Sequence, residues 1–208
     1  MTGESLTPEQ AHELLELMSN GDGFDQGMDS GTALTLADIA LQIGQPHRAE
    51  ALISHAIDLA KENEDKDQLA WALLTKARIT SDGEALAEAD EWVAMSEDDW
   101  LRSAYNNQCG IHALESDDIP AAKAAFAQSL ALKEMLEDLV GQANTLYNLG
   151  EISRGEGNIE QAKAFHARCV DLLEELDDKK GMVNGLAILG HLEAMEDNVD
   201  GAIIHYEA

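Results

Sequence analysis

His166 and Cys169 are the residues whose types and spacing come nearest to a chemical site. They are three positions apart, so on a helix both would lie on one face, where an imidazole and a thiolate could bind a transition metal. This spacing alone is a weak signal. The acidic residues Asp22, Asp25 and Asp29 lack the alternate-residue spacing and the final Glu of a calcium loop. We therefore expect no metal site and no cofactor.

Catalytic motifs are missing from the sequence as well. The chain has no glycine-rich phosphate loop, no G-x-S-x-G nucleophile elbow and no His-Glu helix motif. Nothing singles out a carboxylate pair among its 41 acidic residues. We expect a protein that is not an enzyme and that acts through a binding surface.

The chain repeats itself every 40 residues over its C-terminal half. Three glycines are each followed twelve residues later by an alanine, in the pairs Gly110 and Ala122, Gly150 and Ala162, Gly190 and Ala202. An Asp or Asn stands between the members of each pair, and the last two copies also share Gly, Asn and Leu columns. So many coincident columns indicate a repeat architecture.

Each copy is expected to form two antiparallel helices. In the fourth copy Leu146, Leu149 and Ile152 recur at three-residue steps and predict one buried stripe. Gly150 lies inside that helix, where glycine costs roughly 1 kcal/mol against alanine. We expect Gly150 to face Ala162, because two small residues let the helices approach closely.

The second helix of each copy carries its own start signal. Asn158 is the expected N-cap of that helix in the fourth copy, with Gln161 completing a capping box. Asp118 and Asn198 take the same position in the neighbouring copies. Pro120 fits in a first helical turn, where its missing N–H would be unpaired in any case.

These columns resemble the tetratricopeptide repeat, whose pattern is a large apolar residue, Leu-Gly, Ala, an aromatic residue and Ala. In the fourth copy the pattern is matched by Leu146, Leu149, Gly150, Ala162 and Cys169, with His166 at the aromatic position. The 40-residue period is similar to the long variety found in kinesin light chain, spindle-orientation adaptors and bacterial regulators. The resemblance is strong over residues 97–208 and weaker before them. It implies an all-α fold, a right-handed α-α superhelix of antiparallel helix pairs.

The expected organisation has two parts. Residues 1–31 are predicted to form an N-terminal capping helix and a glycine-rich loop, and residues 32–208 a solenoid of about five helix pairs, the last one truncated. The paired helices are expected at 32–44 and 46–63, 67–81 and 84–95, 97–115 and 118–137, 139–155 and 158–177, and 179–195 and 198 to the end.

Charge and cysteine usage limit the partners and the compartment. With 13 basic and 41 acidic side chains the net charge is −28, which disfavours nucleic acid and anionic membrane surfaces as partners. The acidity fits either solubility, as in a salty cytoplasm, or the attraction of a basic partner. Cys109 and Cys169 are expected to be buried on helices that are not adjacent, so we expect no disulfide and a cytoplasmic location.

The resemblance also implies a binding face. In tetratricopeptide proteins the first helix of each pair lines a concave groove, and the matching positions here are Asn107, Gln108 and Ile111, then Asn144, Tyr147, Asn148, Glu151 and Arg154, and then Asn184, Ile188 and His191. Amide side chains donate and accept hydrogen bonds, so such a row suits the backbone of an extended peptide. In the alternative, Asn144 and Asn184 only form hydrogen bonds between neighbouring helices.

The sequence thus predicts a non-enzymatic module that binds a protein or peptide in this groove, within a larger scaffold or regulator. The alternative is a self-assembling module that forms homo-oligomers through its terminal repeats. Arg78 and Arg154 are placed where the groove is expected, so a ligand is predicted to bring an acidic group to Arg154. In the alternative, both arginines only pair with acids on their own helices.

Overall fold

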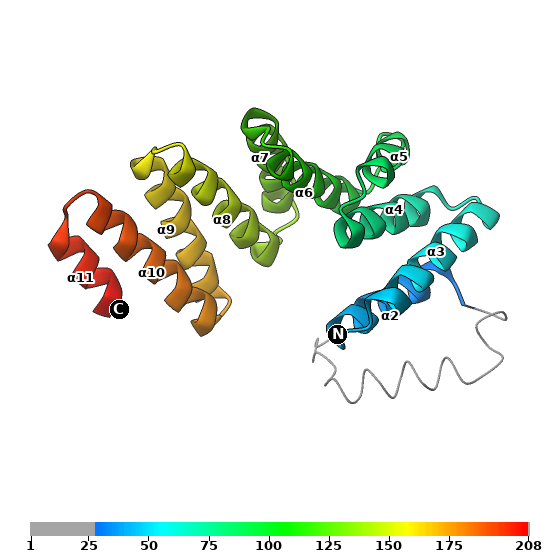
Figure 1. The fold of residues 1–208 in the computed structure, drawn as a ribbon, viewed down its shortest axis with the longest axis horizontal. Coiled ribbons are helices and arrows are strands. Elements are labelled where there is room, and N and C mark those ends of the chain that lie inside the picture. The colour runs from blue at the N-terminus through cyan, green and yellow to red at the C-terminus, as the bar shows by residue number, and fades with distance from the viewer. Residues whose placement is uncertain (1–27, 208) are drawn as a thin grey trace. The chain divides into compact units, whose positions relative to one another are not determined.

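The computed structural model describes residues 28–207, so the expected capping helix and most of the glycine-rich loop lie outside the described residues. Over residues 28–207 the secondary structure is entirely helical (Figure 1). The helices are α2 (Ser30–Gln42), α3 (Pro46–Glu62), α4 (Lys66–Thr80), α5 (Gly83–Val93), α6 (Asp99–Glu115), α7 (Ile119–Met135), α8 (Leu139–Gly155), α9 (Ile159–Glu175), α10 (Lys179–Met195) and α11 (Val199–Glu207). The paired helices expected from residue 32 onward are confirmed, with bounds that differ by at most two residues at each end.

The chain divides into two compact units, one ending at Leu101 and one starting at Arg102. In the first unit α2 packs on α3, α3 on α4 and α4 on α5, and in the second unit each helix from α7 to α11 packs on the next. This sequential packing is that of stacked helix pairs. One continuous solenoid over residues 32–208 stays a prediction.

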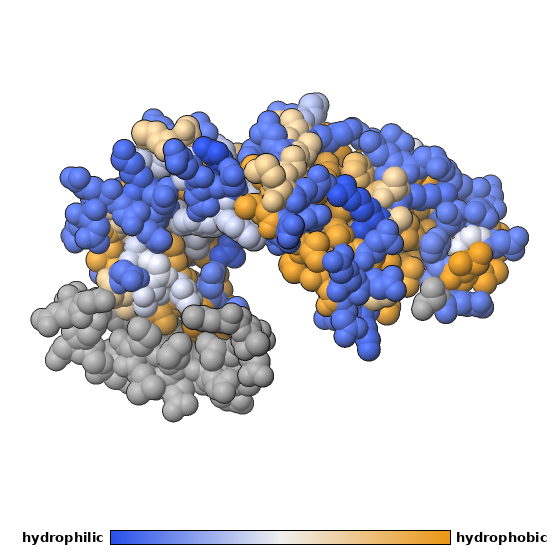
Figure 2. All heavy atoms as spheres, turned by 180° about the vertical axis from the view of Figure 1, so that it is seen from behind, coloured by the Kyte–Doolittle hydropathy of each residue, from blue (hydrophilic) through white to orange (hydrophobic). Residues whose placement is uncertain are grey.

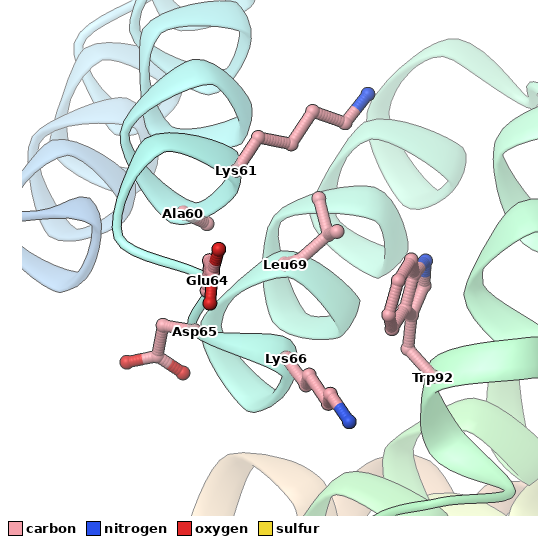
Figure 3. Close-up of a pocket in the computed structure, with 7 residues that line it drawn as sticks. All are labelled: Ala60, Lys61, Glu64, Asp65, Lys66, Leu69 and Trp92. Carbon is pink, nitrogen blue, oxygen red and sulfur yellow. The ribbon is translucent and has the colours of Figure 1, made fainter.

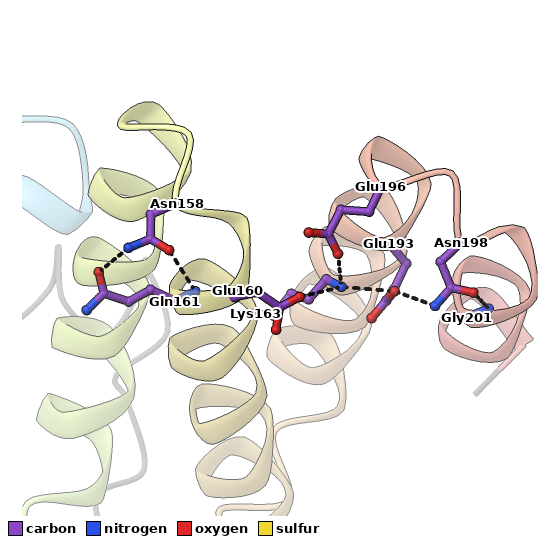
Figure 4. Close-up of polar contacts among 8 residues, drawn as sticks. All are labelled: Asn158, Glu160, Gln161, Lys163, Glu193, Glu196, Asn198 and Gly201. Atoms are coloured by element: carbon purple, nitrogen blue, oxygen red, sulfur yellow. Dashed lines mark hydrogen bonds and ion pairs between the residues drawn. The ribbon is translucent and has the colours of Figure 1, made fainter.

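The expected N-caps of the second helices are confirmed. The side-chain oxygens of Asp118, Asn158 and Asn198 accept hydrogen bonds from the backbone N–H groups three residues on, at 3.0, 3.3 and 3.1 Å. The capping box differs in detail from the expected one. Gln161 Oε1 accepts from the side-chain Nδ2 of Asn158 at 3.1 Å (Figure 4), because the backbone N–H of Asn158 already donates to the carbonyl of Ser153 at 2.9 Å.

The first helices are capped in the same way, which explains one glycine column of the repeat. Asp138 and Asp178 accept from the backbone N–H groups of Gly141 and Gly181 at 2.9 and 3.0 Å. A Cβ atom at either glycine would collide with the capping carboxylate. Glycine is therefore needed for close approach at this position.

Gly150 has a nearer neighbour than the expected Ala162. The atoms nearest to a Cβ atom at Gly150 belong to the ring of His166, at 2.6 to 2.8 Å. Ala162 is fully buried, but it lies one turn before the residue that covers the glycine. Because helical side chains lean toward the N-terminus of their helix, the covering ring comes from four residues further along.

The same ring-on-glycine contact occurs in the neighbouring pairs. Phe126 covers Gly110 and Tyr206 covers Gly190, in each case sixteen residues after the glycine. The aromatic position of the repeat therefore packs against the glycine of the Leu-Gly pair. The predicted stripe of Leu146, Leu149 and Ile152 is confirmed as buried.

Hydrogen bonds from the second helix to the first also recur. Ser129 Oγ donates to the carbonyl of Ser103 at 2.9 Å, and forty residues later Cys169 Sγ donates to the carbonyl of Ala143 at 3.3 Å. Cys169 is buried as expected, whereas the expectation for Cys109 is wrong because that residue is only half-buried. Burial raises the pKa of the Cys169 thiol, which disfavours the reactive thiolate.

Lys133 is a buried cation that ties three helices of the second unit together. Its Nζ donates to Asn107 Oδ1 on α6 at 3.2 Å and to Thr145 Oγ1 on α8 at 2.8 Å. Its carbonyl accepts from Gln142 Nε2 at 3.1 Å. Burial lowers the pKa of Lys133, and the nearby charge of Asp138 opposes that shift.

Ion pairs link α7 and α9 to the end of the next first helix in the second unit. Lys123 Nζ lies 2.8 Å from Glu156. Forty residues later Lys163 Nζ contacts Glu196 and lies 3.0 Å from Glu193 and 3.5 Å from Glu160 (Figure 4). The carboxylates of Glu196 and Glu193 raise the pKa of Lys163. Because these ion pairs are partly exposed, each adds little to the free energy of unfolding. Their main effect is on how the two helices align.

The turns between helices in the second unit share one backbone conformation. In the second unit Asp117, Glu137, Asp177 and Asp197 have left-handed φ values of 58°, 55°, 51° and 59°, and Gly157 completes the series with 76°. The N–H of the following residue returns to a carbonyl in the last helical turn, as from Asp138 to Lys133 at 2.9 Å. This is the Schellman pattern, which normally favours glycine at the left-handed position.

Candidate functional site

The residues expected to line the groove lie on three helices of the second unit, α6, α8 and α10. We call this set the A-helix face, and its members differ in exposure. Exposed are Asn144, Tyr147, Arg154, Asn184 and His191; half-buried are Asn107, Ile111, Asn148, Glu151 and Ile188; buried is Gln108.

Three amides of the A-helix face, all on α8 and α10, have no hydrogen bond to another residue of the described chain. They are Asn144, Asn148 and Asn184, so the alternative in which Asn144 and Asn184 bond between neighbouring helices is not what residues 28–207 show. Asn107 differs, because its side-chain oxygen accepts from Lys133. The unengaged amides keep both donor and acceptor capacity for a ligand.

Arg154 and Glu151 form an ion pair on the same face. Arg154 Nε lies 3.1 Å from Glu151 Oε1, and Nη2 lies 2.5 Å from Oε2, in a two-point contact. The pair lowers the pKa of Glu151 and raises that of Arg154. Arg78 instead pairs with Asp38 of α2 at 2.6 Å, so the expected alternative of pairing on its own helix is wrong for this arginine.

His166 lies directly beneath this ion pair. The imidazole is 1% exposed, and the edge of its ring meets Tyr147 with centroids 5.6 Å apart and planes at 76°. Its Nε2 is 3.3 Å from Glu151 Oε1, but neither ring nitrogen has hydrogen-bond geometry to a described residue. Burial lowers the pKa of His166, and Glu151 opposes that shift. His166 is therefore a packing residue that supports Tyr147 and Glu151.

A metal site is not formed by the residues that the structure describes. No group of three or more His, Cys, Asp or Glu side chains converges within residues 28–207. Cys169 directs its sulfur to a backbone carbonyl, and His166 packs against Gly150.

A pocket in the first unit was not anticipated from the sequence. It has a volume of about 300 Å³ and lies between the end of α3, the start of α4 and Trp92 of α5 (Figure 3). Its residues come from different positions of the weakest repeats, so no column of the repeat singles them out. The one hint of this pocket in the sequence is a tryptophan near turns that are rich in glutamate and aspartate.

The last helix leaves a set of large apolar side chains exposed. They are Val199, Ile203, Ile204 and Tyr206, with 64%, 46%, 66% and 58% of their surface exposed. Figure 2 shows apolar surface at this end of the second unit, at the right of the view. The equivalents of Ile203 in the preceding second helices are lysines, Lys123 and Lys163.

Comparison with known proteins identifies the repeat. The tetratricopeptide repeat family model matches residues 143–172, which include most of α8 and α9. No curated protein matches the sequence. The solved structure of BtubC (BKLC) from P. vanneervenii has a TM-score of 0.69 to this chain at 16% identity, covering 96% of this chain and 85% of that protein. At that identity the likeness shows the fold alone.

The tetratricopeptide repeat is in general a non-enzymatic protein-interaction repeat, which indicates a protein-interaction module here. Within residues 28–207 no helix is both long and apolar enough to span a bilayer. The chain carries a tetratricopeptide repeat at residues 143–172 and has the fold of a tetratricopeptide-like helical solenoid.

Proposed function

We propose that the chain is a non-enzymatic interaction module that binds an extended peptide or protein segment along the A-helix face. The observation that carries this proposal is the set of three amides, Asn144, Asn148 and Asn184, that form no hydrogen bond within the described chain. Each can both donate to and accept from a peptide backbone. Tyr147 stands between them, 44% exposed, and its ring is held in place by His166.

The ligand is proposed to bring an acidic group to Arg154. Glu151 occupies Nε and one Nη of the guanidinium, and the remaining N–H groups of the five can bind a second carboxylate. The pair also sets an electrostatic condition on the ligand. A ligand without an acidic group would leave the remaining N–H groups of Arg154 without a carboxylate to bind, and Glu151 would stay the only acid beside the guanidinium.

The proposed role is that of a scaffold or regulator in the cytoplasm, with protein partners and without nucleic acid or membrane partners. The net charge of −28 supports the choice of partners, because phosphate surfaces bind clustered cations.

Peptides selected from a random display library against the whole chain provide the test. The double variant Asn144→Ala/Asn184→Ala is expected to weaken their binding about tenfold, since each lost hydrogen bond contributes roughly 0.5 to 1.5 kcal/mol. Gln128→Ala is the matched control, because it removes an exposed amide of the same unit from α7. Fluorescence anisotropy measures the affinities. Equal affinities of the parent and the double variant for every selected peptide would refute binding at this face.

Self-assembly through α11 is a second candidate function, favoured by its exposed apolar side chains. Sedimentation is expected to show association that grows with concentration and with salt, because salt screens the repulsion between two copies of charge −28. Ile203→Lys introduces the residue found at the equivalent positions 123 and 163 and is expected to abolish association. Val183→Lys places the same charge at an exposed site on α10 and is the control. A strict monomer at every concentration and salt level excludes this candidate.

A further inference from the structure

The pocket of the first unit has an apolar floor and a mixed charged rim. Ala60 and Leu69 form the floor and are 1% and 4% exposed. Trp92 forms one wall, with the face of its indole ring turned toward Leu69 and Lys66 (Figure 3). A volume of about 300 Å³ is at the small end of the range for ligand sites, so the pocket suits one side chain of a partner.

The rim charges are not equivalent, because Lys61 and Asp65 are already engaged by other residues. Figure 3 shows the ammonium group of Lys61 pointing away from the space between Glu64 and Trp92, whereas the side chain of Lys66 extends toward Trp92 along the lower edge of the pocket. Lys61 is paired with Glu88 of α5 at 3.4 Å. Asp65 is the N-cap of α4, and its Oδ1 accepts from the backbone of Gln68 at 3.0 Å.

Glu64 is the carboxylate that remains for the pocket. It occupies the left-handed position of the turn after α3, with φ 56°, and in Figure 3 it lies to the left of Leu69, across that residue from Trp92, among the lining residues. The pocket thus combines an aromatic face, an apolar floor and one carboxylate.

We propose that this pocket binds a basic side chain of a protein partner, and arginine in preference to lysine. The aliphatic stem of arginine would cover Ala60 and Leu69, and its planar guanidinium would stack on Trp92 while it pairs with Glu64. The net charge of −28 favours the approach of a basic segment from solution. This site lies in the other unit from the A-helix face and is independent of the function proposed there.

The test uses the indole N–H resonance of Trp92 in the full-length chain as a local reporter. Nε1 of Trp92 is buried without a hydrogen-bond partner among the described residues. A change in the chemical shift of its N–H therefore reports binding in the pocket and not the loss of a hydrogen bond. Nα-acetyl-arginine amide is titrated at low salt and compared with Nα-acetyl-citrulline amide, which has the same shape without the charge. A Trp92→Phe variant assigns the signal among the three tryptophans.

The arginine compound is expected to move the Trp92 signal in a saturable manner, and the citrulline compound is not. Glu64→Gln is expected to weaken arginine binding by about fivefold, the upper end for an exposed ion pair. Glu62→Gln removes the same charge from the exposed end of α3 and is expected to leave binding unchanged. Equal shifts with citrulline, equal binding by Glu64→Gln, or no shift at all would each overturn the proposal.

Discussion

Replacing Gly110 by alanine is expected to destabilise the second unit by up to about 2 kcal/mol, because overpacking a core usually costs about 1 to 3 kcal/mol and alanine offsets roughly 1 kcal/mol of that. The added Cβ atom would lie 2.7 to 2.8 Å from three ring atoms of Phe126. Phe126 is fully buried, so its ring has no space to move into. The cost of the clash exceeds the gain of roughly 1 kcal/mol that alanine brings to a helix. Urea unfolding followed by circular dichroism measures the change.

Gly190→Ala is the matched control for this effect. The same ring contact exists there, with Tyr206, but Tyr206 is 58% exposed and can turn aside. The helix propensity of alanine then decides the sign, and we expect little change or a small stabilisation. Equal losses in both variants would mean that the ring contact does not determine the cost.

Replacing His166 by phenylalanine is expected to stabilise the protein more at pH 5 than at pH 8. Burial lowers the folded-state pKa of His166 below the ordinary 6.5, so the unfolded chain binds a proton that the folded chain does not. The stability contributed by the neutral imidazole is therefore complete above pH 6.5 and is lost as the pH falls below it. The slope for one proton is about 1.4 kcal/mol per pH unit. Phenylalanine takes up no proton. Its ring fits such a position, because Phe126 packs in the same way on Gly110 in the preceding helix pair.

Urea unfolding of parent and variant between pH 5 and pH 8 measures this difference. His191→Gln removes an exposed imidazole from α10 and is expected to keep the pH profile of the parent. A gain from His166→Phe that is the same at pH 5 and pH 8 would show that His166 is not the residue that takes up the proton on unfolding.

The elements of the fold could be predicted because their signals are local in the sequence. A cap residue such as Asn158 and its partner Gln161 are three positions apart, and the apolar stripe through Leu146 spans a few turns of one helix. Their contacts do not depend on where the rest of the chain lies. For this reason the helix bounds and caps agree with the structure.

Contacts between helices could be predicted only in part. The repeat shows that Gly150 needs a close neighbour, but Ala162 and His166 are both candidates on α9, and the lean of helical side chains toward the N-terminus brings the ring of His166 nearest. Lys133 was unremarkable as a sequence position, and its burial follows from helices on both sides of it. The positions of the face residues came from the family pattern, whereas only the structure shows which amides have no partner.

The left-handed turns between helices have a consequence for where stability could be gained. Four of the five such turn positions in the second unit carry a carboxylate, although a side chain costs roughly 1 to 2 kcal/mol there and negative charge is unfavourable at the end of a helix. Gly157 forms the same turn without that strain. Glycine at these turn positions is thus expected to raise the free energy of unfolding without altering any packed side chain. The carboxylates that now stand there contribute to the acidic surface and lower the stability of the fold.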